Sequence, residues 1–231
     1  MPTITTTADS SDGWARNAVA LASGDWAATQ GDATTTGTGS KFTTPFYHFG
    51  VYSIRMAGRG ADTYYNARSF YEFDLSGESG TATSATFQSR MDHLGAGSGT
   101  EDEVIMVAAT ALAGSNVDYG NVYSSGTTWG TAYSSNTAIS STLGVQTITL
   151  NAAAITAINS AIGSGKFICA MVGHYFDYLG NTPLLADSGN PYTKIRLEFS
   201  EAPAAFRPIL TTTTYGIAVA EDNAVFFGAN F

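Results

Sequence analysis

The stretch from Ala67 to Ser76 constrains the fold more than any other part of the chain. It alternates between apolar and polar residues and stops at an Asp-Leu-Ser turn, and a second β-rich segment, Thr83–Phe87, follows shortly after it. Alternation with a period of two is typical of a strand that has one face against a core. The pattern therefore predicts one sheet of an all-β sandwich.

Further segments predict strands along most of the chain. The predicted strands cover residues 3–7, a segment that opens at Trp14, and residues 46–56, 67–74, 82–93, 103–112, 145–150, 166–175, 192–199 and 207–214. Turn-rich spacers separate them, which is typical of a sandwich or jelly roll. Within residues 46–56, Gly50 is expected to form a β-bulge.

One helix is expected, over Ala152–Ile162. Asn151 can cap its first turn, isoleucines recur at spacings of three and four, and Gly163 or Gly165 would end it. Residues 23–45 are poor in apolar residues and are expected to be irregular or edge structure anchored by Trp26. We therefore predict a single jelly-roll-like antiparallel β-sandwich over residues 1–215, with one short helix and a C-terminal extension over residues 216–231.

The charge of the chain limits its partners. Charged residues make up 13% of the 231 residues, about half of the usual ~25%, and the formal net charge is −9. An acidic surface with few Lys and Arg repels phosphate, so we expect neither nucleic-acid nor membrane partners. The first residues lack the basic and apolar regions of a signal peptide, and no stretch approaches the ~20 apolar residues of a membrane span. We therefore expect no secretion by a standard signal; a protein that ends up outside a cell without one can leave as part of a particle.

No arrangement of catalytic residues stands out, so we predict no enzyme activity, catalytic residue or cofactor. His48, His93 and His174 lack an HxH or HExxH partner, and no Gly-x-Ser-x-Gly motif is present. Glu72 and Asp74 share one side of a strand, as a pair of glycosidase carboxylates would. Asp74 is explained better as the turn residue that ends the strand.

Other polar residues give weaker signals. Asp9, Asp12 and Asp177 are the carboxylates that best suit a structural calcium ion, but no EF-hand spacing accompanies them, and no metal site is predicted. Residues 100–103 (Thr-Glu-Asp-Glu) are expected to form a solvated loop. Cys169 is the single cysteine and lies among apolar residues, which predicts a buried, inert thiol and no intrachain disulfide.

Aromatic residues between positions 119 and 133 are the candidates for ligand contact. They are mixed with Gly, Ser and Thr, a composition that suits adaptable binding loops. Ordinary packing in the core or at its rim is the alternative explanation. The candidate glycan contacts are Tyr119, Tyr123, Trp129 and Tyr133.

Residues 216–231 are short, apolar and aromatic. Such a segment is an aggregation liability if it is left in water. It either folds back as one more strand of its own sandwich or docks on another copy or another protein. We predict docking in a homo-oligomer, with a trimer as the expected state. The candidate assembly residues are Ile217, Val219, Val225, Phe226, Phe227 and Phe231.

Four segments carry recognisable motifs in a fixed order. Residues 8–14 (ADSSDGW) form an Asp-Gly-aromatic turn, and residues 68–74 (RSFYEFD) followed by 83–87 (TSATF) match R-x-F-x-x-F-D … S-A-x-L, with Phe87 in place of Leu. Residues 174–178 (HYFDY) precede Pro183, and residues 207–215 (RPILTTTTY) match R-P-x-L-x-V-x-Y, with Thr in place of Val. Together they resemble a family of β-sandwich modules related to carbohydrate-binding domains of the DNRLRE type.

The resemblance spans most of residues 3–215 and implies a sandwich without a catalytic set. Relatives of this family are common among phage structural proteins. It therefore implies a non-enzymatic virion protein of a tailed bacteriophage, either a capsid decoration protein or a component of the tail or its fibres. Its partners would be copies of itself and other virion proteins, and its location the virion. The alternative is a glycan-binding module that recognises the host surface.

Overall fold

The computed structural model describes residues 2–10, 12–20, 26–31, 48–57, 62–94, 102–110, 122–125, 128–183, 192–200 and 202–215. The predicted assembly arm, residues 216–231, lies outside these residues, and so does Tyr119. The predictions for those positions stay predictions.

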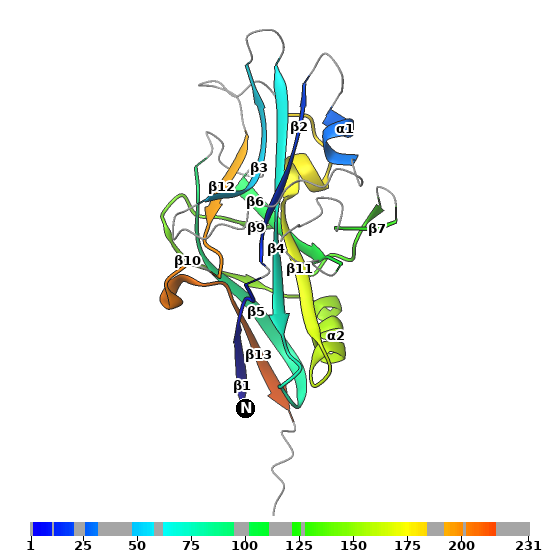
Figure 1. Ribbon diagram of the computed structural model, residues 1–231, viewed down its shortest axis with the longest axis vertical. Coiled ribbons are helices and arrows are strands. Elements are labelled where there is room, and N and C mark those ends of the chain that lie inside the picture. The colour runs from blue at the N-terminus through cyan, green and yellow to red at the C-terminus, as the bar shows by residue number, and fades with distance from the viewer. Residues whose placement is uncertain are drawn as a thin grey trace, which may run out of the picture.

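The described chain folds as an all-β antiparallel sandwich, which confirms the predicted fold class (Figure 1). Its large sheet contains β1 (Thr3–Thr7), β2 (Gly13–Ala20), β3 (His48–Met56), β4 (Thr63–Asp74), β5 (Thr81–His93), β6 (Glu103–Ala108), β9 (Thr137–Ala138), β10 (Gly144–Thr149), β11 (Lys166–Gly173), β12 (Thr193–Leu197) and β13 (Ile209–Tyr215). A separate ribbon pairs β7 (Tyr123–Ser125) with β8 (Thr128–Trp129).

The large sheet curves into two layers. One layer has the order β1-β13-β5-β10, and the other has the order β2-β4-β11-β6-β9. β12 and β3 continue from β5 to β4 and join the layers. The long strands change partners along their length: β5 pairs with β13 over Thr81–Gln88 and with β12 over Met91–His93.

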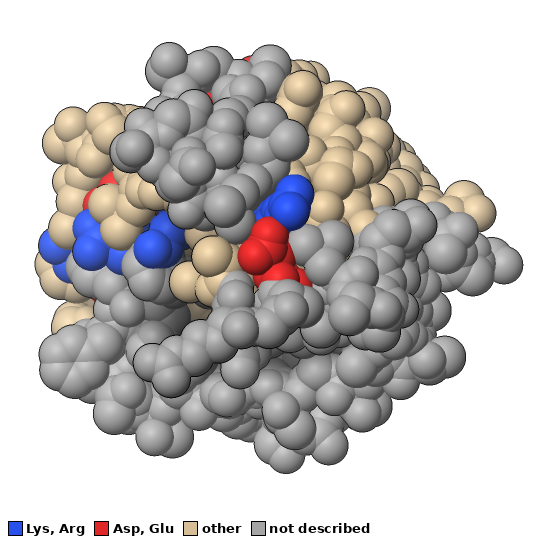
Figure 2. Space-filling view, turned by 90° about the horizontal axis from the view of Figure 1, so that it is seen from above, with Lys and Arg blue, Asp and Glu red and all other residues tan. Residues whose placement is uncertain are grey.

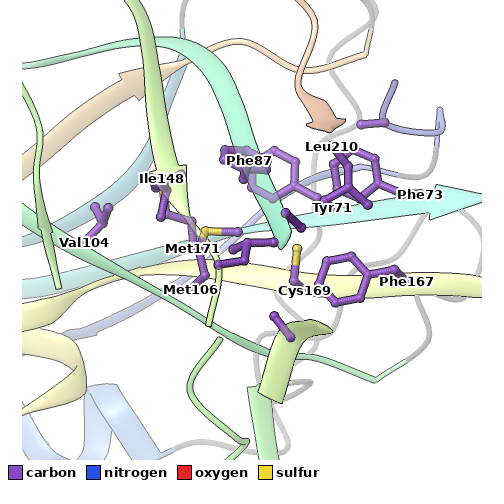
Figure 3. Close-up of a cluster of buried hydrophobic side chains, with 14 of the residues drawn as sticks. Tyr71, Phe73, Phe87, Val104, Met106, Ile148, Phe167, Cys169, Met171 and Leu210 are labelled. Atoms are coloured by element: carbon purple, nitrogen blue, oxygen red, sulfur yellow. The ribbon is translucent and has the colours of Figure 1, made fainter. Parts of the chain in front are cut away.

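The main core fills the space between the layers (Figure 3). Tyr71 of β4 lies with its ring centroid 4.7 Å from that of Phe87 of β5, and Phe73 lies 6.4 Å from Phe167 of β11. Aromatic pairs at these distances stabilise a core beyond the area that they bury. Cys169 is 1% exposed, and burial raises the pKa of its thiol. The predicted buried cysteine is confirmed.

Helix α2 (Ala152–Ala161) confirms the predicted helix. The Asn151 side chain accepts hydrogen bonds from the backbone N–H groups of Ala153 (2.9 Å) and Ala154 (3.1 Å), as an N-cap should. Gly163 follows the helix with φ of 73°, a conformation that glycine adopts readily. Ile158 is fully buried against the main core.

The predicted bulge at Gly50 is confirmed as well. Ile195 of β12 pairs with Val51 of β3, whereas the next residue, Arg196, pairs with Phe49, so Gly50 is the extra residue of the ladder. A Cβ atom at Gly50 would lie 2.4 Å from the Ser69 Oγ atom. Glycine is required here because the neighbouring strand approaches closely.

Two local predictions fail. Helix α1 (Trp26–Gly31) forms where irregular structure was expected, although Trp26 is an anchor, 2% exposed and packed against Tyr64 and Phe176. Strand β11 ends at Gly173, and the predicted strand residues His174 and Tyr175 belong to the π-helix η3 (His174–Tyr178). The cause is a buried ion pair between Asp177 of η3 and Arg68 of β4.

Several charged side chains of the described residues are paired with one another. Arg55–Asp62 (2.8 Å) is partly exposed on both sides, whereas Arg90–Glu198 (2.9 Å) and Arg196–Asp92 (2.5 Å) each join a partly exposed arginine to a buried carboxylate. Figure 2 views the end at which β3 leads into β4, and it shows an acidic and a basic group in contact there. No helix among the described residues has both the length and the apolar character that crossing a membrane requires.

Candidate functional site

The outer face of the second layer carries its own apolar cluster. Neighbouring residues of a strand point to opposite faces, so Tyr71 and Cys169 enter the main core, whereas Phe70 and Ala170 enter this second cluster. Val122, next to β7, lies fully buried within it. Through this cluster, Val122 and Trp129 pack the described residues of the β7–β8 ribbon against the sheet.

A buried ion pair fixes η3 to the same face. Arg68 Nε donates a 2.7 Å hydrogen bond to Asp177 Oδ2, and Arg68 Nη2 donates one of 2.7 Å to Asp177 Oδ1. Both side chains are fully buried. Arg68 Nη2 also donates to the Gln30 carbonyl oxygen at 3.1 Å, and the Trp129 ring covers the guanidinium at 4.7 Å. A buried ion pair is tolerated only when its geometry is excellent and its remaining donors are satisfied. This requirement bends the chain at η3 instead of extending β11.

Three rings form a row beside the ion pair. The Trp129 and Tyr178 ring centroids lie 5.2 Å apart, and the His174 ring stacks on Tyr178 at 6.0 Å with an interplanar angle of 23°. All three side chains are partly exposed. The row therefore presents ring surface to solvent.

Polar groups continue the row from His174. His174 Nδ1 lies 3.2 Å from Glu103 Oε2, and Asn136 Nδ2 donates a 2.7 Å hydrogen bond to the same oxygen. The His174 and Glu103 side chains are 16% and 18% exposed. We call Trp129, Tyr178, His174, Glu103 and Asn136 the ring-and-carboxylate site. Apolar ring faces beside a few fixed polar groups suit a ligand that has both apolar C–H faces and hydroxyl groups, such as a sugar.

The predicted glycan contacts divide between the two faces of the layer. Trp129 belongs to the ring-and-carboxylate site, and Tyr123 pairs with it across the β7–β8 ribbon. Tyr133 instead packs against the main core, with its ring centroid 5.3 Å from that of Phe167, and burial raises its pKa. Tyr133 is partly buried at the rim of the main core, which is the packing that the alternative explanation expected for it.

The sequence did not identify Tyr178, His174, Glu103 or Asn136 as contacts. Glu103 was predicted both as the end of a solvated loop and as the first residue of a strand; β6 begins there, which confirms the strand start, and Glu103 holds two polar neighbours instead of pointing freely into solvent. His174 and Tyr178 are four residues apart, and this spacing brings side chains together only in a helix. The spacing of His174 and Tyr178 would therefore indicate a shared site only if a helical turn had been predicted at residues 174–178.

The carboxylates considered for calcium lie in separate places. Asp9 accepts from Lys166 at 2.9 Å, Asp12 accepts from the Ser200 hydroxyl at 2.6 Å, and Asp177 binds Arg68. Across the described ranges, no three His, Cys, Asp or Glu side chains come together as a metal site would need. These carboxylates act as structural acceptors.

The two carboxylates considered for glycosidase chemistry also have structural roles. Glu72 is 4% exposed and hydrogen-bonds the Lys166 ammonium group. Asp74 is exposed and accepts from the Ser76 N–H at 2.9 Å, which confirms it as the turn residue that ends β4.

A second candidate surface consists of the edges of the first layer. β1 and β10 are its outer strands, and neither contains a charged residue or a proline. Their ladders with β13 and β5 are regular and free of bulges. In the described part of the chain, backbone contacts limit both edges at one end: Leu150, just beyond β10, bridges Ser134, and the N–H of Asp9, just beyond β1, donates to the Glu72 carbonyl oxygen of β4 at 2.8 Å. We call β1 and β10 the open edges.

Open edges of this kind are unusual. Natural sheets commonly block their edges with charges, prolines or bulges, because unpaired N–H and C=O groups attract other strands. Val145 of β10 is 59% exposed, and Thr3, Thr5 and Thr7 of β1 are exposed too. Both edges can therefore accept another strand.

Comparison with known protein families and with curated proteins found no match for this chain. The resemblance to DNRLRE-type modules stays a prediction from the four segments that carry it. Function is therefore inferred from the geometry of the molecule.

Proposed function

We propose that the protein is a non-enzymatic structural component of a tailed-phage virion that acts by self-assembly, as a capsid decoration protein or a component of the tail or its fibres. The two open edges support self-assembly most directly. Copies that each carry a net charge of −9 repel one another, and an interface of backbone hydrogen bonds between uncharged strands avoids bringing those charges together. The sequence resemblance supports a virion as the place of assembly.

Mass spectrometry of purified particles tests this proposal. We expect the protein in virions at a stoichiometry that is constant between preparations and survives a high-salt wash. Deletion of residues 216–231 should leave a folded sandwich that no longer joins particles. Absence of the full-length protein from washed virions would contradict the proposal.

Glycan binding at the ring-and-carboxylate site is a second candidate function. The stacked rings of Tyr178 and His174, with the Glu103 carboxylate beside them, favour it. A sugar ring can pack on an aromatic face while a carboxylate accepts its hydroxyl hydrogens. This role is compatible with a virion protein that contacts the host surface.

A glycan array with host-surface polysaccharides tests the second candidate. Glu103→Gln should weaken binding about tenfold or more, because it removes the carboxylate charge, and a hydrogen bond to a charged group is worth about 1.5–3 kcal/mol. Asn136→Ala removes a neutral amide worth about 0.5–1.5 kcal/mol and should weaken binding about two- to tenfold. Tyr133→Phe changes an aromatic residue of the same region that faces the core, and it should bind as the unmodified protein does. If no polysaccharide binds, or if all three variants bind equally well, the site has no such role.

A further inference from the structure

We infer that copies of this chain join by pairing β1 of one copy with β10 of the next, so that the first layers of neighbouring copies form one continuous sheet. This inference rests on the proposed self-assembly and names the surface that performs it. In each copy, β1 is occupied by β10 of one neighbouring copy, and β10 is occupied by β1 of another.

Strand direction supports this pairing. β1 is antiparallel to β13, β13 to β5, and β5 to β10, so β1 and β10 run in opposite directions. A second copy placed beside the first in the same orientation therefore presents β10 antiparallel to β1. Antiparallel strands form the regular hydrogen-bond ladder that the rest of this sheet already has.

The lengths of the two edges are similar. The bridge to Ser134 occupies Leu150, just beyond β10, so β10 offers six residues (Gly144–Thr149) and β1 offers five. A register that uses all five residues of β1 places Thr5 opposite Thr147 and Ile4 opposite Ile148. Ile4 and Ile148 both belong to the buried face within their own copies, so the apolar side of the sheet continues across the junction.

The exposed face continues as well. Within one copy, Thr5, Thr211, Thr86 and Thr149 lie opposite one another in a single row across the layer. In the proposed register, Thr3 meets Thr149 and Thr5 meets Thr147, so threonine rows extend into the next copy. Cross-strand threonine pairs stabilise sheets.

A symmetric pairing of two β1 strands fits less well. It would place Ile4 opposite Thr6 when Thr5 lies on the axis, and it would leave β10 of both copies unpaired. Pairing β1 with β10 satisfies both edges of every copy. A repeated contact between two different surfaces closes into a ring or continues as a filament, and the expected trimer corresponds to closure at three copies.

Cysteine cross-linking of the full-length protein tests the pairing. The variant Thr5→Cys/Thr147→Cys carries one new thiol on each open edge, and the buried Cys169 does not compete. With dissolved oxygen and a copper catalyst as the oxidant, we expect covalent multimers on a non-reducing gel. A disulfide within one copy is excluded, because three strand spacings of about 4.8 Å separate the edges, well beyond the ~7 Å limit for Cα atoms.

Single variants and a displaced pair serve as controls. Thr5→Cys alone and Thr147→Cys alone should stay monomeric on the gel, and so should Thr5→Cys/Thr156→Cys, whose second thiol lies on the exposed face of α2. Dimers from Thr5→Cys alone would show β1–β1 pairing and would overturn the inference. Equal cross-linking of the displaced pair would show random collision and would overturn it too.

Light scattering of purified protein separates this inference from the proposed function. Thr5→Lys and Val145→Lys should each reduce the oligomer to smaller species by placing charge on an edge, whereas Thr156→Lys should not. If the protein is in virions but the edge variants assemble normally, β1–β10 pairing is wrong and the virion role stands. If the edges cross-link but virions lack the protein, the pairing stands and the virion role is wrong.

Discussion

Arg68 and Asp177 hold the outer face of the second layer together at the scale of single residues. They are 109 positions apart in the chain, fully buried, and joined by two hydrogen bonds of 2.7 Å. Because Trp129 packs on the guanidinium, the ion pair also positions one ring of the ring-and-carboxylate site. A substitution in this ion pair should therefore also shift the Trp129 ring at the surface.

Asp177→Ala should destabilise the fold by about 3–5 kcal/mol, because it leaves the Arg68 charge buried without a partner. Asp62→Ala breaks a partly exposed ion pair and should change stability by at most about 1 kcal/mol. Urea unfolding followed by tryptophan fluorescence measures both changes. Similar small losses in the two variants would mean that water reaches Arg68.

Sequence reasoning could not find this ion pair. Asp177 was interpreted as a weak calcium candidate, and Arg68 as one letter of a strand motif. Nothing in the spacing of two residues so far apart shows that they meet. By contrast, Asp74 and Asn151 act on residues within three positions of themselves, and both roles were predicted correctly.

Strand β3 shows how an element depends on one glycine. Gly50 shifts the register against β12, and both Ser69 Oγ and the Leu197 side chain approach the place where a Cβ atom would stand. The bulge could be predicted because glycine interrupts a clear alternation. Its reason, the closeness of Ser69, required the folded chain.

Gly50→Ala should destabilise the fold by about 1–3 kcal/mol through overpacking. Gly144→Ala is the matched control in another strand, because no atom lies within 4 Å of the added Cβ, and it should change stability by less than about 1 kcal/mol. Thermal unfolding monitored by circular dichroism compares the two. Equal melting temperatures would show that β3 can shift away from Ser69.

Elements with their own sequence signal were the ones that could be predicted. Thr3–Thr7 and the cap of α2 have such signals and were placed correctly. Helix α1 has six residues, too few for a periodic pattern, and β8 and β9 have two each. The π-helix η3 depends on the contact between Asp177 and the distant Arg68, so no local sequence pattern predicts it.

At the scale of the whole molecule, Lys166 ties the two layers together. It lies at the start of β11 and binds both Asp9, just beyond β1, and Glu72 of β4. The hydrogen bond from Lys166 holds the pKa of Asp9 below its usual value of 3.8. This contribution to stability is therefore complete above pH 3.8 and is lost as the pH falls through the lower pKa of the folded state.

Asp9→Asn should remove part of the acid sensitivity of the fold. Between about pH 5 and pH 2, the unmodified protein should lose more stability than the variant, by less than about 1 kcal/mol because Asp9 is partly exposed. Urea midpoints across this range measure the difference. Ser10→Ala removes a hydroxyl donor to the same carboxylate that lowers the pKa of Asp9 less than Lys166 does, so this variant should keep most of the acid sensitivity. A variant with an unchanged pH profile would mean that Lys166 does not hold Asp9 in solution.

The pairing of β1 with β13 has a consequence for biosynthesis. Thr3 lies opposite Thr213, so β1 cannot pair until the last strand of the sheet has been synthesised. Contacts between residues so far apart in the chain form slowly, because a long loop must close first. The layer that bears the open edges can therefore be completed only after residues up to 215 have left the ribosome, and until then the edge of β1 that later pairs with β13 is unpaired as well.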